Sequence, residues 1–148
     1  MPATVQIVSR ASGNAITGIG TAGDIFLFEE PIDEEAAVQR WTLQAQDSAE
    51  DCLILSVSVP GQAIGLPSDT APGEIAALQV VPTENAQIWR ISRRIANPPY
   101  FFLLEGDNDM LMSLASTGNQ PIQVAPRTEH ANQQWTFLPV FAQLGNDG

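Results

Sequence analysis

The chemically reactive side chains of this sequence are few and isolated. The single histidine, His130, could serve as a general base, but no serine or cysteine accompanies it in a nucleophilic motif. Cys52 is the only cysteine, and its apolar surroundings, Cys52-Leu53-Ile54-Leu55, favour a small core residue over a nucleophile. No His/Cys set has metal-ligand spacing, and nothing pairs two carboxylates for glycoside hydrolysis. The sequence therefore predicts a protein without catalytic residues, metal or cofactor.

Acidic residues are abundant and gather between Glu29 and Glu35, where five of seven residues are carboxylates. That run could collect a cation or dock a basic partner, although a solvated acidic loop is the commoner structure. The stretch Asp107-Asn108-Asp109 is too short for an EF-hand type calcium loop, which spreads its ligands over about 12 residues.

The overall charge excludes some classes of partner. The 148 residues include 17 Asp and Glu, six Arg and no Lys, which gives a net charge of −11. Such a charge argues against binding to nucleic acid or to anionic membranes, and no apolar run approaches the ~20 residues of a membrane helix. Met1-Pro2-Ala3-Thr4-Val5 has no features of a secretory leader, so we expect a cytoplasmic protein.

Short apolar segments alternate with turn residues along the chain. The 11 glycines and 11 prolines are scattered and interrupt any helical period. Turn residues recur about every 8–12 positions, which favours an all-β sandwich or barrel. Within this pattern, Gly18 to Gly23 is expected to be a flexible loop.

Three copies of one motif divide the chain. Gln39-Arg40-Trp41 returns as Gln87-Ile88-Trp89 and as Gln133-Gln134-Trp135, and the tryptophans lie 48 and 46 residues apart. Before each copy comes a strand, a polar turn, a second strand, a loop and a third strand running to a proline. We predict one domain, residues 1–148, with units at about 5–48, 52–92 and 99–141. Three units are too few to close a propeller. A solenoid would need polar capping repeats at its ends, and the sequence contains none.

The three Gln-x-Trp copies resemble the ricin B-type β-trefoil lectin family, and the resemblance spans essentially the whole chain. It implies an all-β fold, a pseudo-threefold barrel of three four-stranded units. The three indoles would fill the core between units and need partners for their N–H groups. The glutamine amides would satisfy backbone groups where neighbouring hairpins meet.

The resemblance also implies where sugars would bind. The family pattern has an aspartate on the second strand, an aromatic ring near the end of the third, and an asparagine before the Gln-x-Trp glutamine. These positions fall on Thr17, Phe28 and Val38 in unit one, and on Gly65, Val81 and Ala86 in unit two, which leaves no site there. In unit three they fall on Met112, Ala125 and Asn132. No unit keeps the aspartate, so an ordinary galactose site is not expected.

Two candidate sites remain. Unit one offers Phe28, Thr17 and Asp24, although Phe28 also suits the core. Unit three offers polar side chains whose amides and carboxylates could bind vicinal hydroxyls: Gln123, Asn132, Gln133, Asp107, Asn108 and His130. The alternative for unit three is a hairpin turn with fold-supporting amides.

The leading hypothesis is a non-enzymatic lectin with atypical sugar sites, whose partners are glycans or glycoproteins. An alternative is a β-trefoil protease inhibitor, because fungal and plant inhibitors share this fold. Its candidate loops contain arginines, Arg93-Arg94 before Pro98-Pro99 and Arg127 after Pro126. The simpler interpretation of those arginines is solubility.

Overall fold

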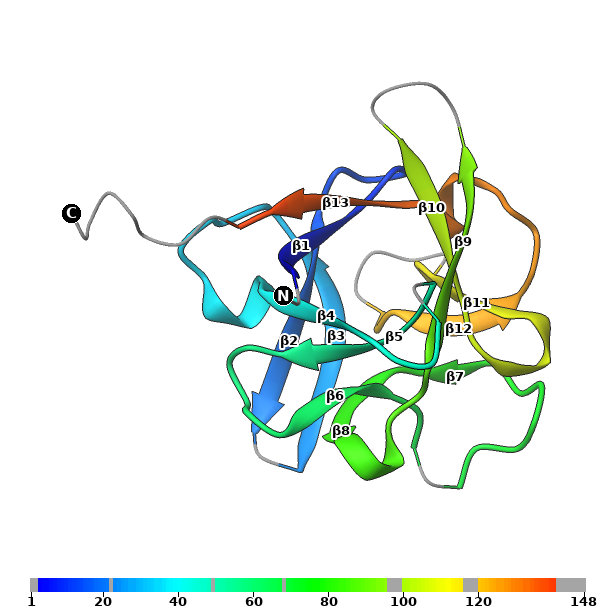
Figure 1. The fold of residues 1–148 in the computed structure, drawn as a ribbon, viewed down its shortest axis with the longest axis horizontal. Coiled ribbons are helices and arrows are strands. Elements are labelled where there is room, and N and C mark those ends of the chain that lie inside the picture. The colour runs from blue at the N-terminus through cyan, green and yellow to red at the C-terminus, as the bar shows by residue number, and fades with distance from the viewer. Residues whose placement is uncertain are drawn as a thin grey trace.

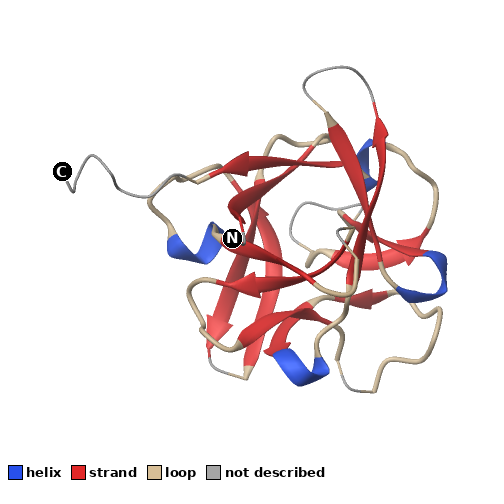
Figure 2. Cartoon of the chain, viewed as in Figure 1, coloured by secondary structure: helices blue, strands red, loops and turns tan. Residues whose placement is uncertain are grey.

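The computed structural model describes residues 3–21, 23–48, 50–67, 69–95, 100–115 and 120–140. Thirteen strands and four short 3₁₀ helices make up the regular structure of these residues (Figures 1 and 2). The strands form because apolar residues alternate with polar ones over short runs. In β5 (Asp51–Ser56), for example, Cys52, Ile54 and Ser56 are buried and the residues between them are half-buried.

Six strands close a barrel. Each strand pairs antiparallel with the next and the last pairs with the first, so the barrel leaves no free edge. In order around the barrel they are β1 (Ala3–Ser9), β4 (Trp41–Ala45), β5, β9 (Trp89–Ile95), β10 (Phe101–Glu105) and β13 (Trp135–Pro139).

Three hairpins, one from each unit, cover one end of the barrel. They are β2 (Ala15–Thr21) with β3 (Asp24–Glu30), β6 (Gln62–Gly65) with β8 (Gln79–Pro82), and β11 (Met110–Ser113) with β12 (Gln123–Pro126). The short strand β7 (Ala76–Ala77) pairs with β12 and so joins unit two to unit three. The four 3₁₀ helices lie outside the barrel (Figure 2) and are η1 (Ala37–Gln39), η2 (Thr83–Asn85), η3 (Asp107–Asp109) and η4 (Ala131–Gln133).

A ring of three backbone hydrogen bonds marks the pseudo-threefold axis. Leu27 N–H donates to Leu78 O at 3.3 Å, Leu78 N–H to Ile122 O at 2.9 Å, and Ile122 N–H to Leu27 O at 2.7 Å. All three side chains are buried. Because this ring relates one residue in each unit, it fixes which residues correspond between units.

The tryptophans occupy equivalent positions in one hydrophobic core. Trp41, Trp89 and Trp135 are at most 1 % exposed. Each indole N–H donates to a carbonyl on the second strand of its own unit, at 3.0 Å to Ile16, 3.3 Å to Ile64 and 3.0 Å to Met112. These bonds satisfy the one polar atom that a buried indole carries.

The architecture is a β-trefoil, as the repeated motif predicts. One local expectation is wrong: Gly18 to Gly23 is not a loop throughout, because β2 continues to Thr21 and pairs with β3 as far as Asp24. No helix in the described part of the chain is long and apolar enough to cross a membrane.

Candidate functional site

In unit three, the motif glutamine anchors the loop before it. Gln133 is 1 % exposed. Its Oε1 accepts hydrogen bonds from Thr128 N–H at 2.7 Å and Glu129 N–H at 2.8 Å, and from the Thr128 hydroxyl. Its Nε2 donates to the Ser113 hydroxyl at 3.0 Å and to Pro126 O at 2.8 Å. Both amide atoms are therefore used by the fold, which leaves Gln133 nothing to offer a sugar.

Unit one repeats this arrangement. Gln39 is 2 % exposed, and its Oε1 accepts from Asp33 N–H at 2.8 Å and from the Gln6 amide at 2.9 Å. Its Nε2 donates to the Thr17 hydroxyl at 3.2 Å and to Pro31 O at 2.9 Å. The predicted fold-supporting role of the glutamine is confirmed in these two units.

Unit two departs from the pattern, and the fold-supporting prediction is wrong for Gln87. This side chain is half-buried rather than buried. Its Nε2 donates only to the neighbouring Ile88 O at 3.0 Å, and its Oε1 has no hydrogen-bond partner among the described residues. The amide oxygen of Gln87 is therefore not used by the described part of the fold.

Two features of the sequence account for the difference. Thr17, Gly65 and Ser113 occupy equivalent positions on the second strands of the three units, because they pair with the equivalent residues Phe28, Gln79 and Gln123. Glycine has no side chain, so unit two lacks the hydroxyl that accepts a hydrogen bond from the glutamine amide in the other two units. The approach of unit two's loop to β6 also requires glycine, because a Cβ at Gly65 would lie 2.7 Å from Val81 Cγ2 and 3.1 Å from Ala86 Cα.

The connection into the motif is also shorter in unit two. Gln87 follows Pro82 by five residues, whereas Gln39 follows Pro31 by eight and Gln133 follows Pro126 by seven. The longer connections end in a 3₁₀ helix whose last residue is the glutamine. In unit two the 3₁₀ helix follows Pro82 directly and ends at Asn85, so the connection is three residues shorter than in unit one and two shorter than in unit three.

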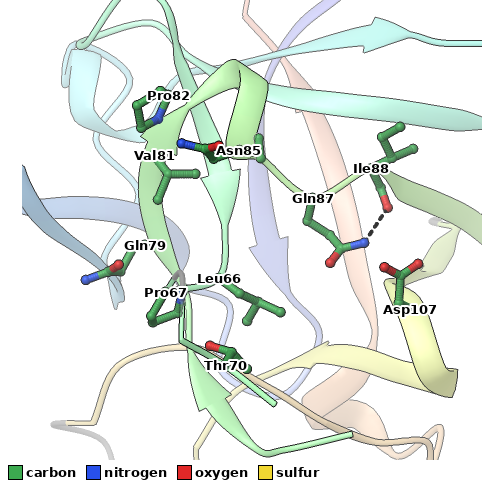
Figure 3. Close-up of a pocket in the computed structure, with 11 residues that line it drawn as sticks. Leu66, Pro67, Thr70, Gln79, Val81, Pro82, Asn85, Gln87, Ile88 and Asp107 are labelled. Carbon is green, nitrogen blue, oxygen red and sulfur yellow. Dashed lines mark hydrogen bonds between the residues drawn. The ribbon is translucent and has the colours of Figure 1, made fainter. Parts of the chain in front are cut away.

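A pocket of about 740 Å³ opens beside Gln87 (Figure 3). It combines amides, a hydroxyl and a carboxylate with apolar surface, and is lined by Leu66, Pro67, Thr70, Gln79, Val81, Pro82, Asn85, Ala86, Gln87, Ile88 and Asp107. A smaller pocket of about 180 Å³ shares Leu66, Thr70, Gln87 and Asp107 with it. The larger pocket lies in unit two, where no sugar site is expected from the sequence: its lining residues follow β6, lie on β8 and precede Trp89, and Asp107 of unit three completes it.

The turn between β10 and β11 brings unit three to the edge of this pocket. Asp107 and Asn108 belong to η3, where Asn108 has a φ of 60°, a left-handed conformation that asparagine tolerates well. A Cβ at Gly106 would lie 3.4 Å from Gln87 Cδ, so glycine allows the glutamine side chain to rest on this turn. Asp107 is exposed, and its carboxylate makes no ion pair or hydrogen bond with the described residues.

The residues predicted for a unit-three site are divided by the structure. Asp107 lines both pockets and Asn108 the smaller one. Gln123 pairs with Ser113, and the amide of Asn132 donates to Leu114 O at 3.3 Å, so these two lie near each other at the other end of the β11–β12 hairpin. His130 is exposed at the start of η4.

Part of the site correspondence inferred from sequence is also corrected. Because Met112 accepts the tryptophan N–H as Ile16 and Ile64 do, the residue of unit three that matches Thr17 and Gly65 is Ser113, not Met112. The axial hydrogen-bond ring likewise matches Phe28 with Gln79 and Gln123, rather than with Val81 and Ala125. Gln79, Asn85 and Gln87 line the larger pocket and were not among the candidate residues drawn from the sequence.

Three carboxylates surround Arg127, an arginine of the alternative inhibitor hypothesis. Its guanidinium contacts Asp109 at 2.7 Å, Glu105 at 2.9 Å and Glu129 at 3.0 Å, and these carboxylates raise its pKa above the usual range. The side chains of Arg93 and Arg94, and the residues Pro98 and Pro99, lie outside the described part of the structure.

The cysteine is a core residue, as predicted. Cys52 is 2 % exposed and belongs to the same hydrophobic cluster as the tryptophans. Burial, together with the neighbouring Asp51 carboxylate, raises its pKa to about 11. The thiol is therefore protonated at neutral pH and unreactive.

The fold matches those of solved β-trefoil proteins. The designed 3-fold symmetric protein ThreeFoil superposes with a TM-score of 0.73 at 15 % identity, covering 91 % of this chain and 97 % of that one. The Rhizoctonia solani agglutinin gives 0.72 at 17 % identity, covering 94 % and 96 %. The Polyporus squamosus lectin, solved with a human-type influenza-binding epitope, Neu5Aca2-6Galb1-4GlcNAc, gives 0.71 at 16 % identity, covering 92 % and 48 %. No protein-family model and no curated protein matches the sequence.

Proposed function

We propose that this protein is a non-enzymatic lectin whose atypical sugar site is the pocket of unit two. The observation that carries the proposal is the free amide of Gln87 beside the unpaired carboxylate of Asp107, at the rim of a pocket of about 740 Å³. The fold supports it, because an agglutinin and a lectin are among the structures that share it.

The pocket has the chemistry that a sugar requires. Amide and carboxylate groups bind vicinal hydroxyls, and the side chains of Gln87 and Asp107 lie at the same edge of the pocket (Figure 3). Leu66, Val81 and Ile88 provide apolar surface for the C–H face of the ring, and Ile88 is 49 % exposed. No aromatic ring lines the pocket, which is why we describe the site as atypical.

Binding without catalysis fits the same residues. A glycosidase places two carboxyl groups across the bond that it cleaves. Asp107 is the one carboxylate among the residues that line the larger pocket. The pocket therefore offers a ligand hydrogen bonds but not the paired acid and base of hydrolysis.

A glycan array tests the proposal. We expect the wild-type protein to bind a restricted set of glycans and Gln87→Ala to lose that binding by at least about tenfold, because the Gln87 amide oxygen has no other hydrogen-bond partner among the described residues. Gln44→Ala is a matched control, since Gln44 is exposed on β4 and does not line the pocket.

Two results would contradict the proposal in different ways. Absence of binding to every glycan at high protein concentration would end the lectin hypothesis. Binding that survives Gln87→Ala but is lost in Asn132→Ala or Gln123→Ala would move the site to unit three.

A further inference from the structure

The ionisable groups that line the two joined pockets are all acidic. Asp107 lines both, and Glu74 lines the smaller one. No arginine or histidine belongs to either lining, and the chain contains no lysine. A ligand that enters these pockets therefore meets negative charge and no positive charge to balance an anionic group of its own.

Asp107 differs from the other carboxylates nearby. Asp109 and Glu105 both contact Arg127, at 2.7 and 2.9 Å, so each has a cationic partner within the fold. The carboxylate of Asp107 has no such partner among the described residues and lies at the pocket. The Arg127–Asp109 contact also fixes the turn that carries Asp107.

The geometry points to the class of sugar. Resting on the sugar-binding function proposed above, we propose that the unit-two pocket selects saccharides with a protonated amine, of the 2-amino-2-deoxyhexose class, over neutral or acidic sugars. The ammonium group donates to the Asp107 carboxylate in a charge-assisted hydrogen bond. A hydroxyl of the same ring donates to the free Oε1 of Gln87, which rests against the same turn.

Neutral and acidic sugars lack part of this interaction. An N-acetylated sugar has no cation to pair with Asp107, so it keeps only the hydrogen bonds to the amides. A sugar carboxylate would be repelled by Asp107 and by the net charge of −11. The preference is expected to be modest, because Asp107 is exposed and solvent weakens the ion pair.

Calorimetric titration with two trisaccharides tests this inference. The probes are the β-1,4-linked trimer of glucosamine and its fully N-acetylated counterpart, at a pH that protonates the amine. We expect the amine trimer to bind about fivefold more tightly, as an exposed ion pair allows. The preference should fall at high salt in the wild-type protein, which provides a readout that requires no substitution.

Two variants localise the effect. Asp107→Asn keeps the size of the side chain and should abolish the preference. Asp47→Asn removes the same charge from an exposed position between β4 and β5, outside both linings, and should preserve it.

Each negative outcome has a distinct meaning. Equal or tighter binding of the acetylated trimer, or a preference that survives Asp107→Asn or high salt, overturns the inference about charge. If neutral glycans still bind through Gln87, the proposed lectin function stands. Binding of neither trimer overturns the choice of sugar class, and the glycan array then decides whether the lectin function fails as well.

Discussion

Units two and three contain the same motif, and comparison of their glutamines shows what the motif specifies. In unit three the amide of Gln133 is buried. Its nitrogen donates to Ser113 and Pro126, and its oxygen accepts from the loop residues Thr128 and Glu129. In unit two the amide of Gln87 lies half-buried at a pocket with its oxygen free. The tryptophans that follow are nevertheless buried alike.

The comparison separates two roles within one motif. The tryptophan packs in the core in every unit. Its burial is tolerated because the indole N–H donates to a carbonyl on the second strand. The glutamine supports the fold only where a hydroxyl on that strand and a long connection surround its amide. Where glycine and a short connection replace them, the amide oxygen of the same residue has no partner in the described part of the fold.

Removal of each glutamine should give the largest contrast. Gln133→Ala leaves two backbone N–H groups, at Thr128 and Glu129, without their acceptor, so we expect a loss of about 3–4 kcal/mol in the free energy of unfolding. Gln87→Ala should cost less than about 0.5 kcal/mol. Urea denaturation measures both, and equal losses would remove the distinction between the units.

The dependence of the free energy of unfolding on alkaline pH tests whether Cys52, the core cysteine of unit two, is fully buried. Burial raises the pKa of Cys52 from 9.0 to about 11. Because the folded state holds this proton more tightly, its stabilising effect is complete below pH 9.0 and is lost as the pH rises from there to about 11. The loss should be about 2–3 kcal/mol, at 1.36 kcal/mol per pKa unit.

Cys52→Ala provides the comparison for this measurement. The variant should be less stable at neutral pH, but its stability should decline less steeply with pH in the same alkaline range. Parallel declines of the two proteins would show that the thiol is not closed off from water.

Gly65→Ser tests the sequence feature that frees Gln87. The new Cβ would meet Val81 Cγ2 at 2.7 Å and Ala86 Cα at 3.1 Å, so we expect a loss of about 2 kcal/mol and a displaced connection before Gln87. Ser113→Ala is the counterpart in unit three and should cost about 1–2 kcal/mol, because the Ser113 hydroxyl donates to Leu111 O and accepts from Gln133 Nε2. A stable Gly65→Ser protein with wild-type glycan binding would argue against the role assigned to this glycine.

Arg127→Gln should have a small effect on stability. The guanidinium is only partly exposed and contacts three carboxylates, so its removal should cost about 1 kcal/mol. The loss should shrink at high salt, because salt screens the repulsion that remains among the carboxylates. Thermal unfolding at two salt concentrations measures this, and a salt-independent loss would mean that packing rather than charge holds the turn.

The sequence predicts the fold well because the fold depends on repeated, buried residues. Trp41, Trp89 and Trp135 recur at near-equal spacing, and such large side chains have few places other than a shared core. The polar turn at Asp107 is likewise visible in the sequence. The extension of β2 past Gly18 is not, because its glycines suggest a loop while pairing with β3 decides the structure.

The site is harder to predict, since it depends on what surrounds an identical motif. Gln87 precedes a tryptophan by two residues, as Gln39 does, and nothing in the motif itself shows that the amide oxygen of Gln87 has no partner. The signals lie elsewhere, in Gly65 on the second strand and in the short connection from Pro82. Their meaning depends on strand register, which the hydrogen-bond ring at Leu27, Leu78 and Ile122 reveals only in the folded structure.

The most direct test of the account is the hydrogen exchange of the glutamine side-chain amides, followed by NMR. We predict that the NH₂ groups of Gln39 and Gln133 exchange at least about a hundredfold more slowly than that of Gln87, because both are buried and bonded on each side. Addition of a bound saccharide should then slow exchange at Gln87 alone. Equal protection of all three amides in the free protein would contradict the account, since no unit would then have a glutamine available for a ligand.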